Sequence, residues 1–228
     1  MIRVTENLPV IRDLLATAAK DAGRDPDSVR LLAVSKRQPL ERVVELAAAG
    51  HRDFGENQVQ EALDKLPSLK EFPITWHFIG SIQSNKTRAV ATHFDWVHAV
   101  DRVKIARRLS DQRPEELGDL NICLQVNIDD EASKSGVRPD QLEALATACV
   151  EMPRLRLRGL MCLPAVRENL DEQRRPFARL RQLKDELART GIDMDTLSMG
   201  MSGDFKAAIL EGATIVRVGT ALFGPRPT

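Results

Sequence analysis

Lys36 is the residue in this sequence whose surroundings most suggest chemistry. It follows an apolar run at residues 31–34, which predicts a strand buried on both faces, and Pro39 suits the first turn of a helix. A lysine at the carboxyl end of a strand lies where α/β folds bind ligands. Burial against apolar walls lowers a lysine pKa, and a neutral amine can attack a carbonyl to form a Schiff base. The alternative is an ordinary surface lysine in a loop.

Two glycine-containing turns near the C-terminus form a second candidate site. The segment at residues 200–203 (Gly-Met-Ser-Gly) and the pair Gly219-Thr220 both follow short apolar runs. Small residues let backbone N–H groups approach a phosphate, and Ser202 and Thr220 add hydroxyl donors. The alternative is two turns that only reverse the chain. A Schiff-base lysine and a phosphate cradle together suit a ligand with an aldehyde at one end and a phosphate at the other, such as pyridoxal 5′-phosphate (PLP) or a phosphorylated sugar.

Other polar residues lie at or near predicted strand ends. Arg217 lies inside an apolar strand, so its guanidinium must reach a ligand site or pair with a carboxylate. Asn57 ends a turn, where it either contacts a ligand or caps the next helix. His77 and His98 face either the ligand site or the core. They have no carboxylate or further histidine at ligand spacing, so we expect no metal site.

The elements that must position these residues alternate regularly between strands and helices. After an N-terminal amphipathic helix at residues 5–22, each predicted strand is followed by a helix or a short turn. The predicted strands cover residues 29–35, 52–54, 76–79, 96–100, 121–128, 155–162, 196–199 and 214–218. Eight such repeats predict an α/β fold, a single (β/α)8 TIM barrel domain over residues 1–228 with one extra N-terminal helix. An open doubly wound sheet is the alternative if the strands at 52–54 and 196–199 are loops.

Composition excludes several classes of function. Lys plus Arg and Asp plus Glu number 33 each, which argues against a general attraction to nucleic acid or to anionic membranes. No apolar run reaches membrane-spanning length, and the charged N-terminus does not resemble a signal peptide. Cys123, Cys149 and Cys162 lie in apolar segments without metal-binding spacing. We therefore expect a cytoplasmic protein with reduced thiols.

A set of short motifs along nearly the whole chain resembles a known family. The motifs are AVSK at 33–36, FGEN at 54–57, VQE at 59–61, WHFIG at 76–80, QSNK at 83–86, SKSG at 133–136, RGLM at 158–161, SMGMSGD at 198–204 and VRVGTALFG at 216–224. Together they resemble the pyridoxal phosphate homeostasis proteins, the YggS/PROSC family.

The resemblance implies a fold-type III PLP-binding barrel of the alanine racemase N-terminal type. It implies that Lys36 carries PLP as an internal aldimine and that Asn57 lies near the ring. It also implies that Ser202, Gly219 and Thr220 hold the phosphate, and that Arg217 faces the pyridine nitrogen and keeps it unprotonated. Lys134 matches a family lysine that is a secondary acceptor candidate.

The resemblance further implies a carrier or regulator in PLP, vitamin B6 and amino-acid homeostasis that is not an enzyme, with apo-enzymes that use PLP as partners. The alternative is an amino-acid racemase or decarboxylase of the alanine racemase-like class. Such a racemase needs acid–base groups on both faces of its substrate, and the tyrosine that serves one face in alanine racemase has no counterpart, because the sequence contains no tyrosine. A Schiff-base aldolase would bind no cofactor. Without a shared active site we expect a monomer.

Overall fold

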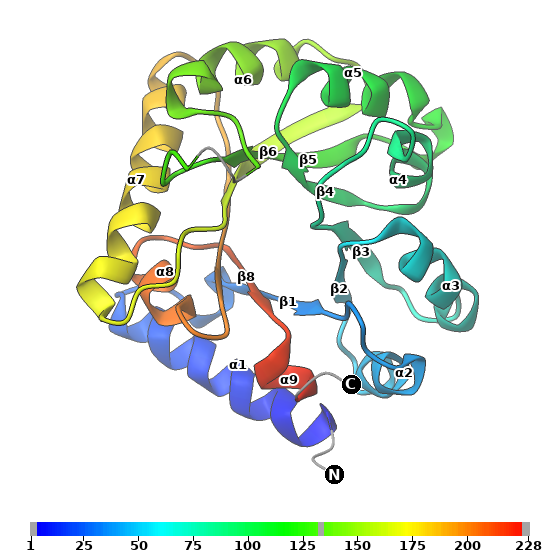
Figure 1. The fold of residues 1–228 in the computed structure, drawn as a ribbon. Coiled ribbons are helices and arrows are strands. Elements are labelled where there is room, and N and C mark those ends of the chain that lie inside the picture. Colours follow the sequence, from blue (N-terminus) through cyan, green and yellow to red (C-terminus); the bar gives the residue numbers. More distant parts are fainter. Residues whose placement is uncertain (1–3, 132–134, 225–228) are drawn as a thin grey trace.

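The fold is a closed barrel of parallel strands. The computed structural model describes residues 4–131 and 135–224. Within them, strands β1 to β8 pair in sequence order, and β8 pairs with β1 to close the sheet (Figure 1). The strands are β1 (Arg30–Val34), β2 (Asp53–Glu56), β3 (Thr75–Phe78), β4 (Trp96–Val100), β5 (Leu120–Val126), β6 (Leu155–Cys162), β7 (Thr196–Met201) and β8 (Ile215–Val218). The (β/α)8 prediction is confirmed, and the open-sheet alternative is wrong because both short segments are strands of the closed sheet.

Helices surround the barrel on its outer side (Figure 1). They are α1 (Val4–Asp21), α2 (Leu40–Ala48), α3 (Val59–Leu69), α4 (Thr87–His93), α5 (Val103–Gln112), α6 (Leu142–Val150), α7 (Leu170–Arg189), α8 (Phe205–Leu210) and α9 (Thr220–Phe223). The extra N-terminal helix α1 packs against α8, α9 and α2. Short 3-10 turns lie at Pro26–Ser28, Glu115–Leu117 and Pro139–Gln141. None of the described helices is long and apolar enough to cross a bilayer.

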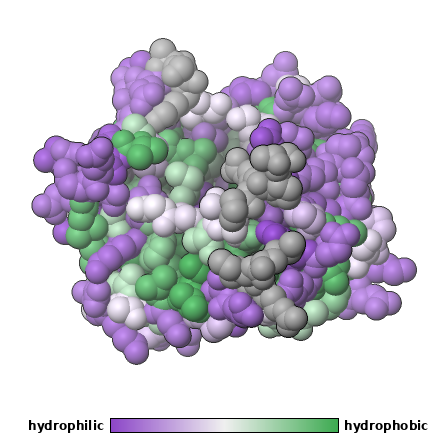
Figure 2. Space-filling model, turned by 60° about the horizontal axis from the view of Figure 1, so that its bottom comes forward, coloured by the Kyte–Doolittle hydropathy of each residue, from purple (hydrophilic) through white to green (hydrophobic). Residues whose placement is uncertain are grey.

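The barrel has two layers of apolar packing because its strands are buried on both faces. The outer layer lies between sheet and helices, where the apolar faces of the helices are covered. A smaller inner cluster fills the barrel with Leu32, Trp96, Ala99, Cys123, Met161 and Ile215. Burying a side chain such as Leu32 contributes about 1.5–3 kcal/mol. On the outer surface in Figure 2, hydrophilic residues dominate the periphery and apolar residues gather in the left half of the view.

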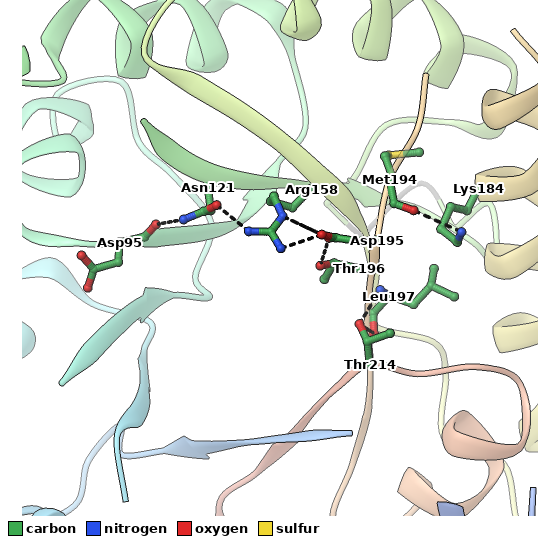
Figure 3. A network of polar contacts seen from close by, with 9 residues as sticks. All are labelled: Asp95, Asn121, Arg158, Lys184, Met194, Asp195, Thr196, Leu197 and Thr214. Atoms are coloured by element: carbon green, nitrogen blue, oxygen red, sulfur yellow. Dashed lines mark hydrogen bonds and ion pairs between the residues drawn. The ribbon is translucent and has the colours of Figure 1, made fainter. Parts of the chain in front are cut away.

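The amino ends of the strands carry a polar network (Figure 3). Arg158 of β6 donates to both carboxylate oxygens of Asp195, at 3.0 Å from Nε and 2.6 Å from NH2, and to Asn121 Oδ1 at 2.9 Å. Its guanidinium also lies 4.9 Å from the centroid of the Trp96 ring. Paired charges and a large aromatic ring therefore occupy this end, which we call the closed end of the barrel. Ligand chemistry is expected at the opposite end, the mouth.

Candidate functional site

A cavity of about 430 Å³ lies at the mouth of the barrel. All six residues predicted as cofactor contacts line it: Lys36, Asn57, Ser202, Arg217, Gly219 and Thr220. They come from the carboxyl ends of β1, β2, β7 and β8, so the closed sheet brings together residues 184 positions apart in the chain (220 − 36). The sequence did not single out several further lining residues, among them Gln38, Ile79 and Leu163.

Lys36 lies in a tight turn between β1 and α2. The next residue, Arg37, has a φ of 57°, a left-handed conformation that is unfavourable for a residue with a side chain. The carboxylate of Glu61, on α3, accepts a hydrogen bond from the Arg37 backbone N–H and holds the turn. The position of Lys36 is therefore fixed by a neighbouring helix as well as by its own strand.

A buried ion pair also holds the turn that carries Lys36. Lys65 Nζ donates to Glu56 Oε1 at 2.6 Å, to Glu61 Oε1 at 2.8 Å and to the carbonyl oxygen of Ser35 at 2.8 Å. Ser35 Oγ also donates to Glu56 Oε1 at 2.7 Å. Glu56 is fully buried, and this burial raises the pKa of its carboxyl although Lys65 and Ser35 lower it. Because Ser35 directly precedes Lys36, the Glu56–Lys65 ion pair connects α3 to the backbone beside Lys36.

The loop that carries Asn57 lies against the loop after β3. A methyl group at Gly80 would lie 2.2 Å from the backbone oxygen of Asn57, so only glycine allows the two loops to approach this closely. The first helical residue of α3 is Val59 and its N-cap is Gln58. Asn57 is therefore not the N-cap of the helix, and it lines the cavity instead.

Arg217 is 4% exposed and borders the cavity from β8. Its NH1 donates to the backbone oxygen and to Oγ of Ser198, at 2.7 and 2.8 Å, and its NH2 donates to the backbone oxygen of Cys162 at 2.9 Å. Burial lowers its pKa, but an arginine side chain remains charged. Its hydrogen-bond partners among the described residues are carbonyl and hydroxyl oxygens. The structural ion pair considered as an alternative is not what holds this side chain.

The two glycine-containing turns meet at the same cavity. Ser202 and Gly203 lie between β7 and α8, and Gly219 and Thr220 lie where β8 passes into α9. A methyl group at Gly203 would meet no atom within 4 Å, so the space beside this residue is open. Turns that only reverse the chain need not line a common cavity, whereas a phosphate-binding site made from two turns requires one. The shared cavity therefore favours the phosphate interpretation.

The remaining candidate residues lie elsewhere. His77 and His98 are fully buried inside the barrel, so the core alternative is correct for both. Within the described residues there is no cluster of His, Cys, Asp and Glu side chains that could hold a metal ion. Cys162 is buried in the core. Lys134 lies outside the described residues.

Comparison with known proteins places this geometry in a family. The profile of the family "Alanine racemase, N-terminal domain" matches residues 10–227. The pyridoxal phosphate homeostasis protein of Pseudomonas aeruginosa is 57% identical over 226 residues, which is 99% of this chain and 97% of that protein. The chain belongs to the pyridoxal phosphate homeostasis protein family.

Two further relatives support this assignment. The pyridoxal phosphate homeostasis protein of Escherichia coli K12 is 50% identical over 231 residues, covering 98% of this chain and 97% of that protein. The structure of PipY from Synechococcus elongatus with PLP bound superposes with a TM-score of 0.86 at 38% identity, covering 97% of this chain and 100% of that one. The resemblance found from the short motifs is thus confirmed over nearly the whole chain.

Proposed function

We propose that this protein binds PLP at the mouth of the barrel, attached covalently to Lys36, and acts in intracellular PLP homeostasis as a carrier rather than as an enzyme. The observation that carries the proposal is the convergence of Lys36, Arg217 and the two glycine-containing turns on one cavity. The family membership supports the cofactor, because the related PipY structure contains PLP.

The residues present fit this cofactor. A cavity of about 430 Å³ is within the range of small-molecule sites, and the open space beside Gly203 leaves room for a phosphate at the turn. When bound, PLP supplies an aldehyde carbon that forms a double bond with Lys36 Nζ and releases water. Lys36 therefore needs to be held at a defined position. The Glu61 contact and the Glu56–Lys65 pair supply that restraint.

Each remaining site residue has a distinct role in the proposal. Ser202, Gly219 and Thr220 bind the phosphate through hydroxyl and backbone groups, and Asn57 lies beside the ring. Arg217 faces the pyridine nitrogen and keeps it unprotonated, because a permanent cation disfavours a second positive charge close by. A ring with an unprotonated nitrogen is a weaker electron sink.

The composition of the cavity favours a carrier over a racemase or decarboxylase. Apart from Lys36 and Arg217, the lining residues in the described part of the chain are not titratable. Racemisation requires a proton donor and acceptor on opposite faces of the substrate, and the 228 residues include no tyrosine that could provide the second one. An amino-acid racemase or decarboxylase of the alanine racemase-like class is accordingly the less favoured of the two candidate functions.

We further infer that the carrier is a monomer that passes PLP to apo-enzymes in the cytoplasm. The three cysteines are unpaired and buried, and burial raises the pKa of each thiol to about 12. Inert, reduced thiols of this kind suit a reducing compartment.

Purified protein mixed with PLP is expected to develop a visible absorption band that survives dialysis, and to transfer PLP to an apo-enzyme in a coupled activity assay. The same sample is expected to racemise or decarboxylate free amino acids far more slowly than about one turnover per second, the lower end of ordinary enzymatic rates. A colourless protein would contradict cofactor binding. Turnover at enzymatic rates would instead establish the racemase or decarboxylase function.

A further inference from the structure

A continuous chain of hydrogen bonds crosses the inside of the barrel. It begins at Asp53, whose Oδ1 lies 3.1 Å from His77 Nε2, and continues from His77 Nδ1 to His98 Nε2 at 2.9 Å. His98 Nδ1 lies 2.8 Å from Ser198 Oγ, which lies 2.8 Å from Arg217 NH1. Asp53 is the first residue of β2, at the closed end, and Arg217 borders the cavity at the mouth. This chain of hydrogen bonds therefore connects the two ends of the barrel through residues of β2, β3, β4, β7 and β8.

The ends of this chain determine the direction of every hydrogen bond in it. An ionised Asp53 only accepts, so His77 must donate from Nε2 and accept at Nδ1. His98 must then donate from Nε2 and accept at Nδ1. Ser198 consequently donates its hydroxyl hydrogen to His98, which leaves its oxygen to accept from Arg217. One arrangement of protons satisfies all five residues, because the donor or acceptor role of each residue determines the role of the next.

The charges around the chain support this arrangement. Burial raises the pKa of the Asp53 carboxyl, but the hydrogen bond from His77 and the charge of Arg30 oppose this effect, and the pKa lies below its usual value. Burial lowers the pKa of His77 and lowers that of His98 well below its usual range. The two imidazoles are accordingly neutral and Asp53 is ionised.

Other charged groups also face the chain. The charges of Arg30 and Asp95 act on His77, and those of Arg30 and Arg217 act on His98. The guanidinium of Arg158 lies 4.9 Å from the centroid of the Trp96 ring, and the His77 ring stacks on Trp96 with centroids 5.5 Å apart. Asp204 acts on Arg217 at the mouth. None of these groups interrupts the series of hydrogen bonds from Asp53 to Arg217.

We propose that Asp53, His77, His98 and Ser198 are positioning residues that orient Arg217 toward the cofactor ring and supply its remote counter-charge. The proposal rests on the proposed function, because it takes Arg217 to face the pyridine nitrogen of PLP. With its hydrogen directed at His98, the hydroxyl of Ser198 presents its oxygen lone pairs to Arg217. The carboxylate of Asp53 at the closed end thus acts on the cofactor through these hydrogen bonds, without contacting it.

The decisive comparison is between two carboxylates at the closed end. Asp53→Asn removes the charge that ends the chain, whereas Asp195→Asn removes a carboxylate that is bound to Arg158 and is not part of the chain. The pH midpoint of the bound chromophore is expected to move by about half a unit to one unit in Asp53→Asn and to stay within about 0.2 units of wild type in Asp195→Asn. Equal shifts in both variants, or no shift in Asp53→Asn, would overturn the proposal.

Ser198→Ala tests the link next to Arg217. It is expected to raise the dissociation constant for PLP about three- to tenfold, the range for one lost hydrogen bond, and to move the same pH midpoint. An unchanged midpoint and affinity would contradict a role for Ser198 in positioning Arg217.

A measurement on protein without ligand separates this inference from the proposed function. Nitrogen NMR of the wild-type imidazoles is expected to show His77 and His98 both neutral with the proton on Nε2. A proton on Nδ1 of either ring, or a charged ring at neutral pH, would overturn the proposed hydrogen-bond order. If wild type takes up no PLP, the proposed function fails. If wild type takes up PLP but Asp53→Asn behaves like Asp195→Asn, only the positioning inference fails.

Discussion

Lys36→Ala is expected to abolish the dialysis-stable absorption band of the PLP-loaded protein. Alanine has no amine to bond the aldehyde carbon, so PLP is retained only by the non-covalent contacts of its phosphate and ring. Loss of a covalent attachment is the largest single effect on cofactor retention that the cavity predicts. The measurement is an absorption spectrum of both proteins after identical loading and dialysis, followed by release and quantification of PLP.

Lys206→Ala provides the matched control for that experiment. Lys206 lies on α8, is largely exposed and pairs with Asp21 at 3.3 Å, outside the cavity. It is expected to keep the wild-type spectrum, which shows that loss of a surface lysine outside the cavity does not by itself remove the band. A dialysis-stable band of wild-type intensity in Lys36→Ala would contradict the assigned role of Lys36.

Lys65→Met is expected to lower the free energy of unfolding by about 3–5 kcal/mol, because it leaves the fully buried Glu56 without its ion-pair partner. Methionine preserves most of the apolar volume of the lysine stem, so the loss reports mainly the unpaired carboxyl. Urea unfolding followed by circular dichroism measures this change. PLP affinity is also expected to fall, because the Lys65 contact with the Ser35 carbonyl is lost next to Lys36.

The double variant Glu56→Gln with Lys65→Met separates charge burial from packing. Removing the unpaired carboxylate as well is expected to recover part of the lost stability, so the two changes are not additive. A loss of less than about 1 kcal/mol in Lys65→Met, or a double variant less stable than Lys65→Met alone, would contradict the buried ion pair as the brace of this turn.

Much of the fold could be predicted because most strands are marked by a short apolar run that a helix or a turn follows. The strand at residues 155–162 has its predicted bounds, since its apolar run ends at Pro164. The strands at Asp53–Glu56 and Thr196–Met201 were the doubtful ones. Their predicted runs were too short to distinguish a strand from a loop, and only pairing with both neighbours establishes them as strands.

The clustering of the candidate site could be predicted because residues at the carboxyl ends of barrel strands converge. The direction of the His98 side chain could not be predicted, because the pairing of β4 with β5 is interrupted beside it. The register shifts between Val97 and Val100, next to His98, so counting residues does not say which face a side chain occupies. The brace formed by Glu61 and Lys65 was also missed. Their spacing of four residues indicates a helix-surface pair, and nothing in the sequence says that they face the turn after β1.

We propose Lys36 as the residue that carries PLP, and borohydride trapping tests this attachment most directly. Reduction of the loaded wild-type protein converts the double bond between Lys36 Nζ and the cofactor carbon into a stable single bond, and proteolysis with mass spectrometry then locates the adduct. One adduct per chain is expected, on the peptide that contains Lys36. An adduct on a different lysine, or no adduct in a protein that retains PLP through dialysis, would contradict this proposal.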